Sequence, residues 1–127
     1  TYSHQGVGNK AYIERYPKYA IPYKYDKELL RKSMQPTIDF MEKYGAKIYV
    51  GEFSVTRWSP DAARYLDELI SVFEELKWDW TYHAFREWDG WSLEHDSNPA
   101  NTGKAEKTTD RMQVMIKYFN KNISTEL

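Results

Sequence analysis

The sequence contains no cysteine, and this absence excludes several kinds of site. Without thiols the chain has no disulfide framework, no cysteine-ligated metal centre and no thiolate nucleophile. Excess charge of one sign is also absent, because 18 Lys and Arg residues stand against 19 Asp and Glu residues. Proteins that bind nucleic acid usually carry a clear basic excess, so we expect no nucleic-acid partner.

Long apolar runs are missing too. A membrane-spanning helix needs about 20 consecutive apolar residues. No segment of the 127 residues approaches that length, so we expect no membrane partner. The chain begins at Thr1, with no signal peptide before it. We therefore expect that an upstream segment was removed or that the chain is a piece of a longer one.

Aromatic residues, in contrast, are abundant. They make up 17% of the chain and include 5 Trp and 11 Tyr. Such residues either fill a core or stack on flat ligands such as sugars and bases. Residues 1–25 combine many tyrosines with glycine and proline and have no sustained period, which predicts a long surface loop. Within that loop we expect His4 to be exposed and regard it as a candidate ligand contact.

Helical patterns alternate with strand patterns along the rest of the chain. A helix over 27–44 is predicted to begin at the cap Asp26 and to end at Gly45 in a left-handed conformation. Pro36 lies inside this pattern, so we expect it to kink or split the helix. A strand is then predicted over 47–53, where β-branched and aromatic residues are concentrated.

The second half repeats the alternation. Ser59 as cap and Pro60 at the first position predict a helix over 60–76. Trp, Thr, Tyr and Phe predict a second strand over 78–85. A last helix follows a cap at Thr108 or Thr109. Its expected buried positions are Met112, Met115, Ile116 and Phe119.

This order predicts an α/β fold in which the two strands are adjacent and parallel. Two parallel strands alone cannot cover both faces or their own edges. We therefore expect the chain to be a slice of a larger sheet or barrel. By itself it is expected to expose strand edges and apolar surface.

Glu52 is the first candidate functional residue. It follows Gly51 at the carboxyl end of the first predicted strand, and that end faces the ligand in parallel α/β proteins. A carboxylate there is a candidate for catalysis. The alternative is a structural ion pair between Glu52 and a nearby arginine such as Arg57.

Two segments together carry a resemblance to a known family. Gly-Glu-Phe-Ser at 51–54 and Trp-Thr-Tyr-His-Ala-Phe-Arg-Glu-Trp at 80–88, with a capped helix between them, resemble the C-terminal part of glycoside hydrolase family 5. This family consists of cellulase-like (β/α)8 TIM barrels. The resemblance implies that residues 1–127 are the C-terminal fragment of one barrel domain, with strands seven and eight and their helices. The N-terminal remainder of the barrel is then a required partner.

The resemblance also implies an activity. The chain would belong to a secreted or periplasmic retaining endo-β-1,4-glucanase that cleaves β-glucan in plant polysaccharide without metal or cofactor and only when the barrel is complete. Another family 5 activity, as a xylanase, mannanase or mixed-linkage glucanase, stays open. So does a non-catalytic carbohydrate-binding or structural fragment.

Residue roles follow from the same resemblance. Glu52 matches the nucleophile of the family's Gly-Glu-Phe motif, whereas the Asn-Glu pair that carries the acid/base is absent from this sequence. The candidate substrate contacts are Phe85, Trp88, Trp58, Trp91, Arg86 and His4. The alternative for each tryptophan is core filling.

Two charged segments have structural alternatives. Arg86 is a candidate donor to the nucleophile, and its alternative is an ion pair with Glu87 or Asp89. The adjacent residues at 94–96 (Glu, His, Asp) cannot easily converge on one ion, so we expect a solvated loop over 92–107 rather than a metal site.

Overall fold

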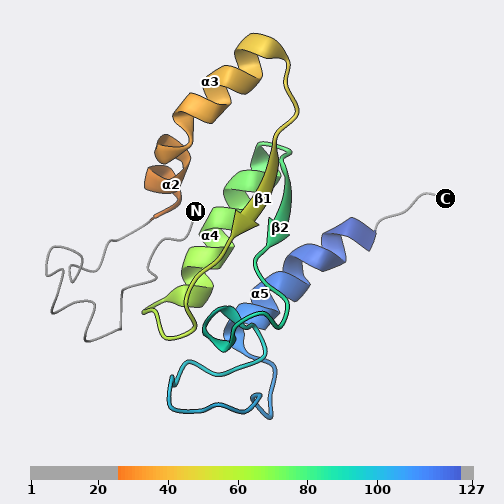
Figure 1. The fold of residues 1–127 in the computed structure, drawn as a ribbon. Helices are drawn as coiled ribbons and strands as arrows, with labels where there is room; N and C mark the ends of the chain where they lie inside the picture. Colours follow the sequence, from red (N-terminus) through yellow and green to blue (C-terminus); the bar gives the residue numbers. More distant parts are fainter. Residues whose placement is uncertain (1–25, 124–127) are drawn as a thin grey trace, which may run out of the picture.

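The computed structural model describes residues 26–123, and in it a pair of strands packs against the helix that connects them (Figure 1). The elements in order are α2 (Lys27–Ser33), α3 (Gln35–Tyr44), β1 (Tyr49–Phe53), α4 (Ala62–Glu75), β2 (Asp79–Tyr82), the 3-10 turn η2 (Asp89–Trp91), α5 (Asp110–Phe119) and the 3-10 turn η3 (Asn120–Ile123). The loop expected over residues 1–25 lies outside the described residues.

The first helical segment is divided as the sequence predicts. α2 ends at Ser33 and α3 begins at Gln35, with Pro36 in the first turn of α3, where a missing N–H costs nothing. Asp26 caps α2, since its side chain accepts a hydrogen bond from the Leu29 backbone N–H. Gly45 ends α3 with φ at 61°, the left-handed conformation that favours glycine. The predictions for both caps and for the break are confirmed.

β1 and β2 are adjacent and parallel, as predicted, and α4 connects them along the chain (Figure 1). β2 is shorter than the predicted strand over 78–85, because regular pairing stops at Tyr82. The His83 backbone N–H still donates to the Phe53 carbonyl at 3.0 Å. Phe85 therefore lies beyond the strand.

The pairing register contains one irregularity, and it falls beside Glu52. Val50 pairs with Trp80 and Phe53 with Tyr82, so β1 has two residues, Gly51 and Glu52, where β2 has one. An extra residue of this kind is a β-bulge, which bends the strand and changes the direction of local side chains. The bulge separates an exposed Glu52 from a fully buried Phe53.

The core lies between the strands and α4. Phe53 meets Phe73 of α4 edge-to-face, with ring centroids 5.3 Å apart. α4 contacts α2, α5 and β2, which explains why so much of it is buried. Its buried residues are Ala62, Tyr65, Leu66, Leu69, Ile70, Val72 and Phe73.

The predicted cap of α4 is wrong. The helix begins at Ala62, so Asp61 rather than Ser59 occupies the cap position, and no side chain caps it. The Ser59 hydroxyl is hydrogen-bonded to the Thr56 hydroxyl at 2.6 Å, inside the buried segment that precedes the helix. Ser59 therefore belongs to the turn before the helix rather than to its cap.

The predicted cap of α5 is correct, but its predicted buried face is partly wrong. The Thr109 side chain accepts from the Met112 N–H. α5 buries Arg111, Met115 and Tyr118, whereas Ile116 and Phe119 are 43% and 47% exposed. The Tyr118 hydroxyl donates to Asp67 of α4 at 2.8 Å, and this contact directs the stripe of Arg111, Met115 and Tyr118 inward.

Two features of the surface fit the expectation of a larger sheet. Within residues 26–123, β1 and β2 form a sheet of two strands. Large apolar side chains are exposed on the helices and strands, including Phe40, Tyr44 and Tyr49. None of the described helices is long and apolar enough to cross a membrane.

A matched pair of isoleucines tests this packing. Ile70 is fully buried in α4, whereas Ile116 is 43% exposed on α5. Replacing a buried isoleucine by alanine costs about 2–5 kcal/mol, since both apolar burial and packing are lost. We expect Ile70→Ala to lower the free energy of unfolding by that amount, measured by urea denaturation followed by circular dichroism. Ile116→Ala should cost much less, and equal losses would contradict the assigned face of α5.

Candidate functional site

Glu52 lies at the β1 bulge with its side chain exposed, and a buried segment follows it. The segment 54–57 is buried throughout, and the Arg57 side chain is fully buried. The chain that follows Glu52 is therefore buried as soon as β1 ends. The structural alternative was an ion pair between Glu52 and Arg57. The NH1 and NH2 groups of Arg57 instead donate to the loop that contains Asp96 and Asn101.

Three of the predicted substrate contacts come together. We call Trp58, Trp88 and Trp91 the tryptophan cluster. The Trp58 and Trp88 rings are 5.6 Å apart and the Trp88 and Trp91 rings 4.8 Å apart, both edge-to-face. The His83 ring lies 4.9 Å from that of Trp91. Trp88 is 43% exposed, so the cluster combines internal packing with an open aromatic surface.

Gly90 allows Trp88 to take its place. A Cβ at Gly90 would lie only 2.4 Å from the Trp88 ring, well inside van der Waals contact. The ring therefore packs directly on the backbone of η2. Since its other neighbours are Trp58 and Trp91, it has little room to move away.

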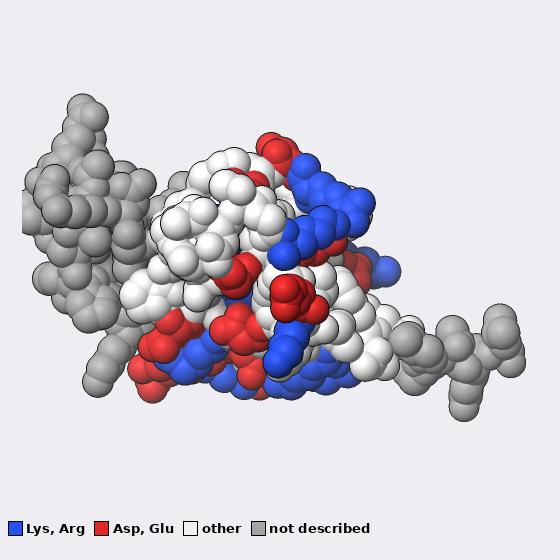
Figure 2. Space-filling view, turned by 90° about the horizontal axis from the view of Figure 1, so that it is seen from below, with Lys and Arg blue, Asp and Glu red and all other residues white. Residues whose placement is uncertain are grey.

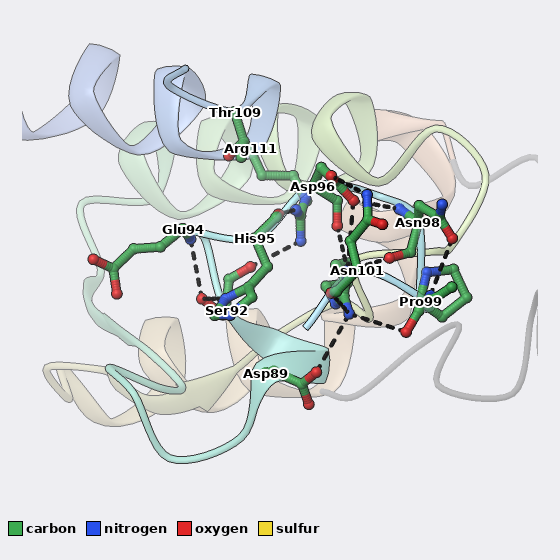
Figure 3. A network of polar contacts seen from close by, with 12 residues as sticks. Asp89, Ser92, Glu94, His95, Asp96, Asn98, Pro99, Asn101, Thr109 and Arg111 are labelled. Atoms are coloured by element: carbon green, nitrogen blue, oxygen red, sulfur yellow. Dashed lines mark hydrogen bonds and ion pairs between the residues drawn. The ribbon is translucent and has the colours of Figure 1, made fainter. Parts of the chain in front are cut away.

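Arg57 ties the loop that follows the cluster to the end of β1. Its NH1 group donates to the backbone carbonyls of Asp96 and Asn98 at 2.7 and 2.6 Å. Its NH2 group donates to the carbonyls of Asn101 and Pro99 and to the Asp89 carboxylate, at 2.8, 3.4 and 3.3 Å. We call these contacts the Arg57 network; Figure 3 labels the residues that supply its acceptors, Asp89, Asp96, Asn98, Pro99 and Asn101.

Short-range hydrogen bonds shape the loop that supplies these carbonyls. The Asp96 carboxylate accepts from the Asn101 side chain at 2.7 Å and from the Asn98 N–H at 2.8 Å. These two contacts, in that order, hold the pKa of the Asp96 carboxyl below its ordinary value. The Asn98 side chain in turn accepts from the Ala100 N–H. The carbonyls thus converge on Arg57 because the loop is turned by its own polar side chains.

A second buried arginine holds the same loop from the side of α5. Arg111 donates to the carbonyls of Ser92, at 3.0 Å, and His95. Burial lowers the pKa of the Arg111 guanidinium, the direction expected when a cation leaves water. The expected loop over 92–107 is present and residues 97–104 are exposed to solvent, while two buried cations hold the backbone carbonyls of its first part. Residues 26–123 contain no group of His, Asp or Glu side chains arranged to hold a metal ion.

Arg86 and Phe85 lie in a different environment. Arg86 forms a two-pronged ion pair with Glu94, at 3.0 and 3.2 Å, and its guanidinium lies over the Phe85 ring. Arg86 therefore pairs with Glu94 and not with either expected partner, Glu87 or Asp89. Hydrogen bonds from Arg86 and then from Lys104 lower the pKa of the Glu94 carboxyl to about 2. This commitment to Glu94 weakens the hypothesis that Arg86 serves the nucleophile.

Beside that ion pair lies a mainly apolar groove of about 410 Å³ between β2 and α5. Its lining includes Trp80, Phe85, Met112, Met115 and Phe119. The Phe119 ring stacks on that of Trp80, with centroids 5.9 Å apart. Phe85 thus lines this groove and takes no part in the ring contacts that define the tryptophan cluster.

Acidic and basic side chains are interspersed on the face seen in Figure 2, and neither sign forms a continuous patch there. The remaining candidate contact, His4, lies outside the described residues. Sequence reasoning named Arg57 only as a possible partner of Glu52 and missed its role in the loop. The available signal was the cluster of Asp, Asn and Pro at 96–101, whose turns present carbonyl groups.

Comparison with known proteins relates part of this chain to cellulase-like enzymes. Over 81 residues it is 36% identical to Endoglucanase C of Acetivibrio thermocellus and to Endoglucanase C307 of Clostridium sp. (strain F1). The match covers 58% of this chain and 24% of each relative, so the chain spans about a quarter of the length of these curated relatives. No protein-family model matches the chain. The similarity to endoglucanases is therefore distant and partial.

A glycine pair tests the packing of the tryptophan cluster. Gly90→Ala places a methyl group where the Trp88 ring lies, whereas a Cβ at Gly103 meets nothing within 4 Å. We expect Gly90→Ala to displace Trp88 and to reduce the near-ultraviolet circular dichroism that arises from its close contact with Trp91. Gly103→Ala is the matched control and should leave the spectrum unchanged. An unaltered spectrum for Gly90→Ala would contradict the arrangement.

The Glu94 ion pairs predict a dependence of stability on pH. The folded-state pKa of Glu94 is lowered from 4.5 to about 2, so the unfolded chain binds more protons between those values. The stabilisation is complete above pH 4.5 and is lost as the pH falls toward 2. Urea denaturation from pH 2 to 6 should show that Glu94→Gln removes this part of the dependence, whereas the exposed Glu106→Gln retains it. Parallel curves for wild type and Glu94→Gln would rule out the ion-pair assignment.

Proposed function

We propose that this chain supplies the C-terminal strands of a (β/α)8 barrel glycoside hydrolase of the family 5 type. The adjacent parallel strands with α4 between them along the chain support this proposal, because such a unit is the repeating element of the barrel. The exposed apolar side chains support it as well. β1 and β2 then correspond to barrel strands seven and eight, and the remaining strands come from outside this chain.

The proposed activity is retaining hydrolysis of β-1,4-glucan within the polymer chain. The observation that carries it is the position of Glu52, an exposed carboxylate at a bulge near the carboxyl end of β1. Active-site residues of barrel enzymes lie at this end of the strands. The endoglucanase relatives support the choice of a polysaccharide substrate. Because such a polymer is too large to enter a cell, we place the activity outside the cytoplasm.

In the proposed reaction, the Glu52 carboxylate attacks the anomeric carbon of the sugar. A carboxylic acid from outside this chain donates its proton to the leaving glycosidic oxygen as the bond breaks. The same group, now a carboxylate, takes a proton from water, which attacks the anomeric carbon and releases Glu52. This mechanism requires the two carboxyl groups to be about 5–5.5 Å apart.

The tryptophan cluster is the proposed sugar-binding surface. A pyranose ring has flat apolar faces that stack on aromatic rings, and Trp88 offers an exposed ring fixed by two others. Phe85 is 80% exposed and borders the groove beside β2, which gives it a separate position for a further contact. The proposed substrate path therefore passes Glu52 and Trp88, with Phe85 a second aromatic contact.

Replacing the proposed nucleophile gives the direct test. Glu52→Gln keeps the shape of the side chain and removes the charge needed to form the covalent intermediate. In the complete barrel we expect turnover of a soluble β-glucan to fall by several orders of magnitude, with oligosaccharide binding retained. The readout is the rate of release of reducing sugar.

Glu87→Gln is the control, since Glu87 lies beyond β2 and pairs with His83 at 3.0 Å. It should keep near-normal turnover. Near-normal turnover by Glu52→Gln would contradict the proposal. A complete wild-type barrel that binds glucan without hydrolysing it would favour a carbohydrate-binding role instead.

A further inference from the structure

We propose that Arg57 is a positioning residue that holds the tryptophan cluster at a fixed place relative to Glu52. This inference rests on the proposed function for its substrate, a β-1,4-linked glucose oligomer. In this inference, the position of the sugar-binding rings depends on a side chain that takes no part in the proposed reaction. Its support is the Arg57 network and the buried backbone between Glu52 and Arg57.

The first link joins Arg57 to Glu52. Only four residues separate them, and Phe53 and Val55 between them are fully buried. The Ser54 hydroxyl donates to the Tyr82 hydroxyl at 3.3 Å, which ties this segment to β2. Because this segment is buried and bonded to β2, it has few alternative conformations. The position of Arg57 is therefore fixed relative to that of Glu52.

The second link joins Arg57 to the tryptophans. Its backbone N–H donates to the Gly90 carbonyl at 2.8 Å, and its NH2 group reaches the Asp89 carboxylate. Asp89 and Gly90 lie between Trp88 and Trp91 in the chain. Arg57 is therefore hydrogen-bonded to the turn that carries both rings. Trp58 follows Arg57 directly. Arg57 is therefore joined to the backbone that carries all three rings, alongside the Tyr82 hydroxyl, which donates to the Trp91 carbonyl at 2.7 Å.

The chemistry of the network calls for arginine in particular. Its acceptors are four backbone carbonyls and a carboxylate that surround a flat guanidinium. Arginine offers donors on two terminal nitrogens in a fixed planar arrangement, and NH1 and NH2 of Arg57 make all of these contacts while its Nε makes none, whereas lysine offers three donors from one nitrogen. Lysine at this position would keep the charge and leave several buried carbonyls without a donor. We therefore expect the loop over 89–101 to lose its fixed position in Arg57→Lys.

The consequence is a selective loss of binding. With the loop released, Trp88 and Trp91 no longer present a fixed surface, and the stacking of a distant sugar ring weakens. We expect affinity for cellohexaose to fall about 10-fold, the size of one lost aromatic contact. The reaction of a small activated aryl glucoside contacts only the residues near the bond that breaks. Its kcat should stay within about twofold of the parent value.

The experiment uses the complete barrel protein and separates binding from chemistry. Calorimetry measures cellohexaose binding in the Glu52→Gln background, with and without Arg57→Lys. Arg64→Lys is the matched control, because Arg64 lies on the surface of α4 and pairs with Glu68. Asp89→Asn is a milder second variant. It removes one charge from the network and should weaken binding in the same direction even where Arg57→Lys lowers stability.

Each outcome decides one question. A 10-fold weaker affinity with unchanged kcat on the small substrate supports the inference. Unchanged cellohexaose affinity in both Arg57→Lys and Asp89→Asn overturns it, even when the wild type hydrolyses glucan. A wild type that hydrolyses nothing, but whose cellohexaose affinity falls in Arg57→Lys and Asp89→Asn, overturns the proposed function and leaves the positioning role standing.

Discussion

The buried guanidinium of Arg57 is the interaction on which the candidate site depends. A cation removed from water is costly unless carboxylates and carbonyls replace its hydration, and here Asp89, Asp96 and four backbone carbonyls do so. Satisfying it forces the loop over 89–101 to fold back against the end of β1. The same fold brings Trp58, Trp88 and Trp91 together. A stability requirement thereby also shapes the proposed sugar-binding surface.

The second constraint is the size of the sheet. Two parallel strands bury one face against α4, but within residues 26–123 they have no further strand to pair with. Tyr49, on β1, is exposed, and β1 has no second neighbouring strand within that range. This arrangement agrees with the partial coverage of the endoglucanase relatives. It is also why we assign the activity to a complete barrel rather than to this chain alone.

Local signals in the sequence predicted local structure well, and long-range contacts account for what was missed. Asp26 and Gly45 were predicted correctly, because a cap depends on only a few neighbouring residues. The cap at Ser59 failed because the helix begins only at Ala62, after a turn in which the Ser59 hydroxyl bonds to Thr56. The role of Arg57 was missed because its partners lie 32 to 44 residues along the chain, and the turn-forming residues at 96–101 do not by themselves say which donor their carbonyls meet. The nucleophile assignment of Glu52 stays a prediction.

The central claim is that Glu52 forms a covalent bond to the sugar during hydrolysis. A 2-deoxy-2-fluoro glycoside with a good leaving group slows release of the intermediate and allows the glycosyl-enzyme to be digested and sequenced by mass spectrometry. The account predicts one sugar ester, on the peptide that contains Gly51, Glu52 and Phe53 of the complete barrel protein. A sugar attached to any other residue, or an enzyme that turns over glucan without ever forming an ester, would contradict it.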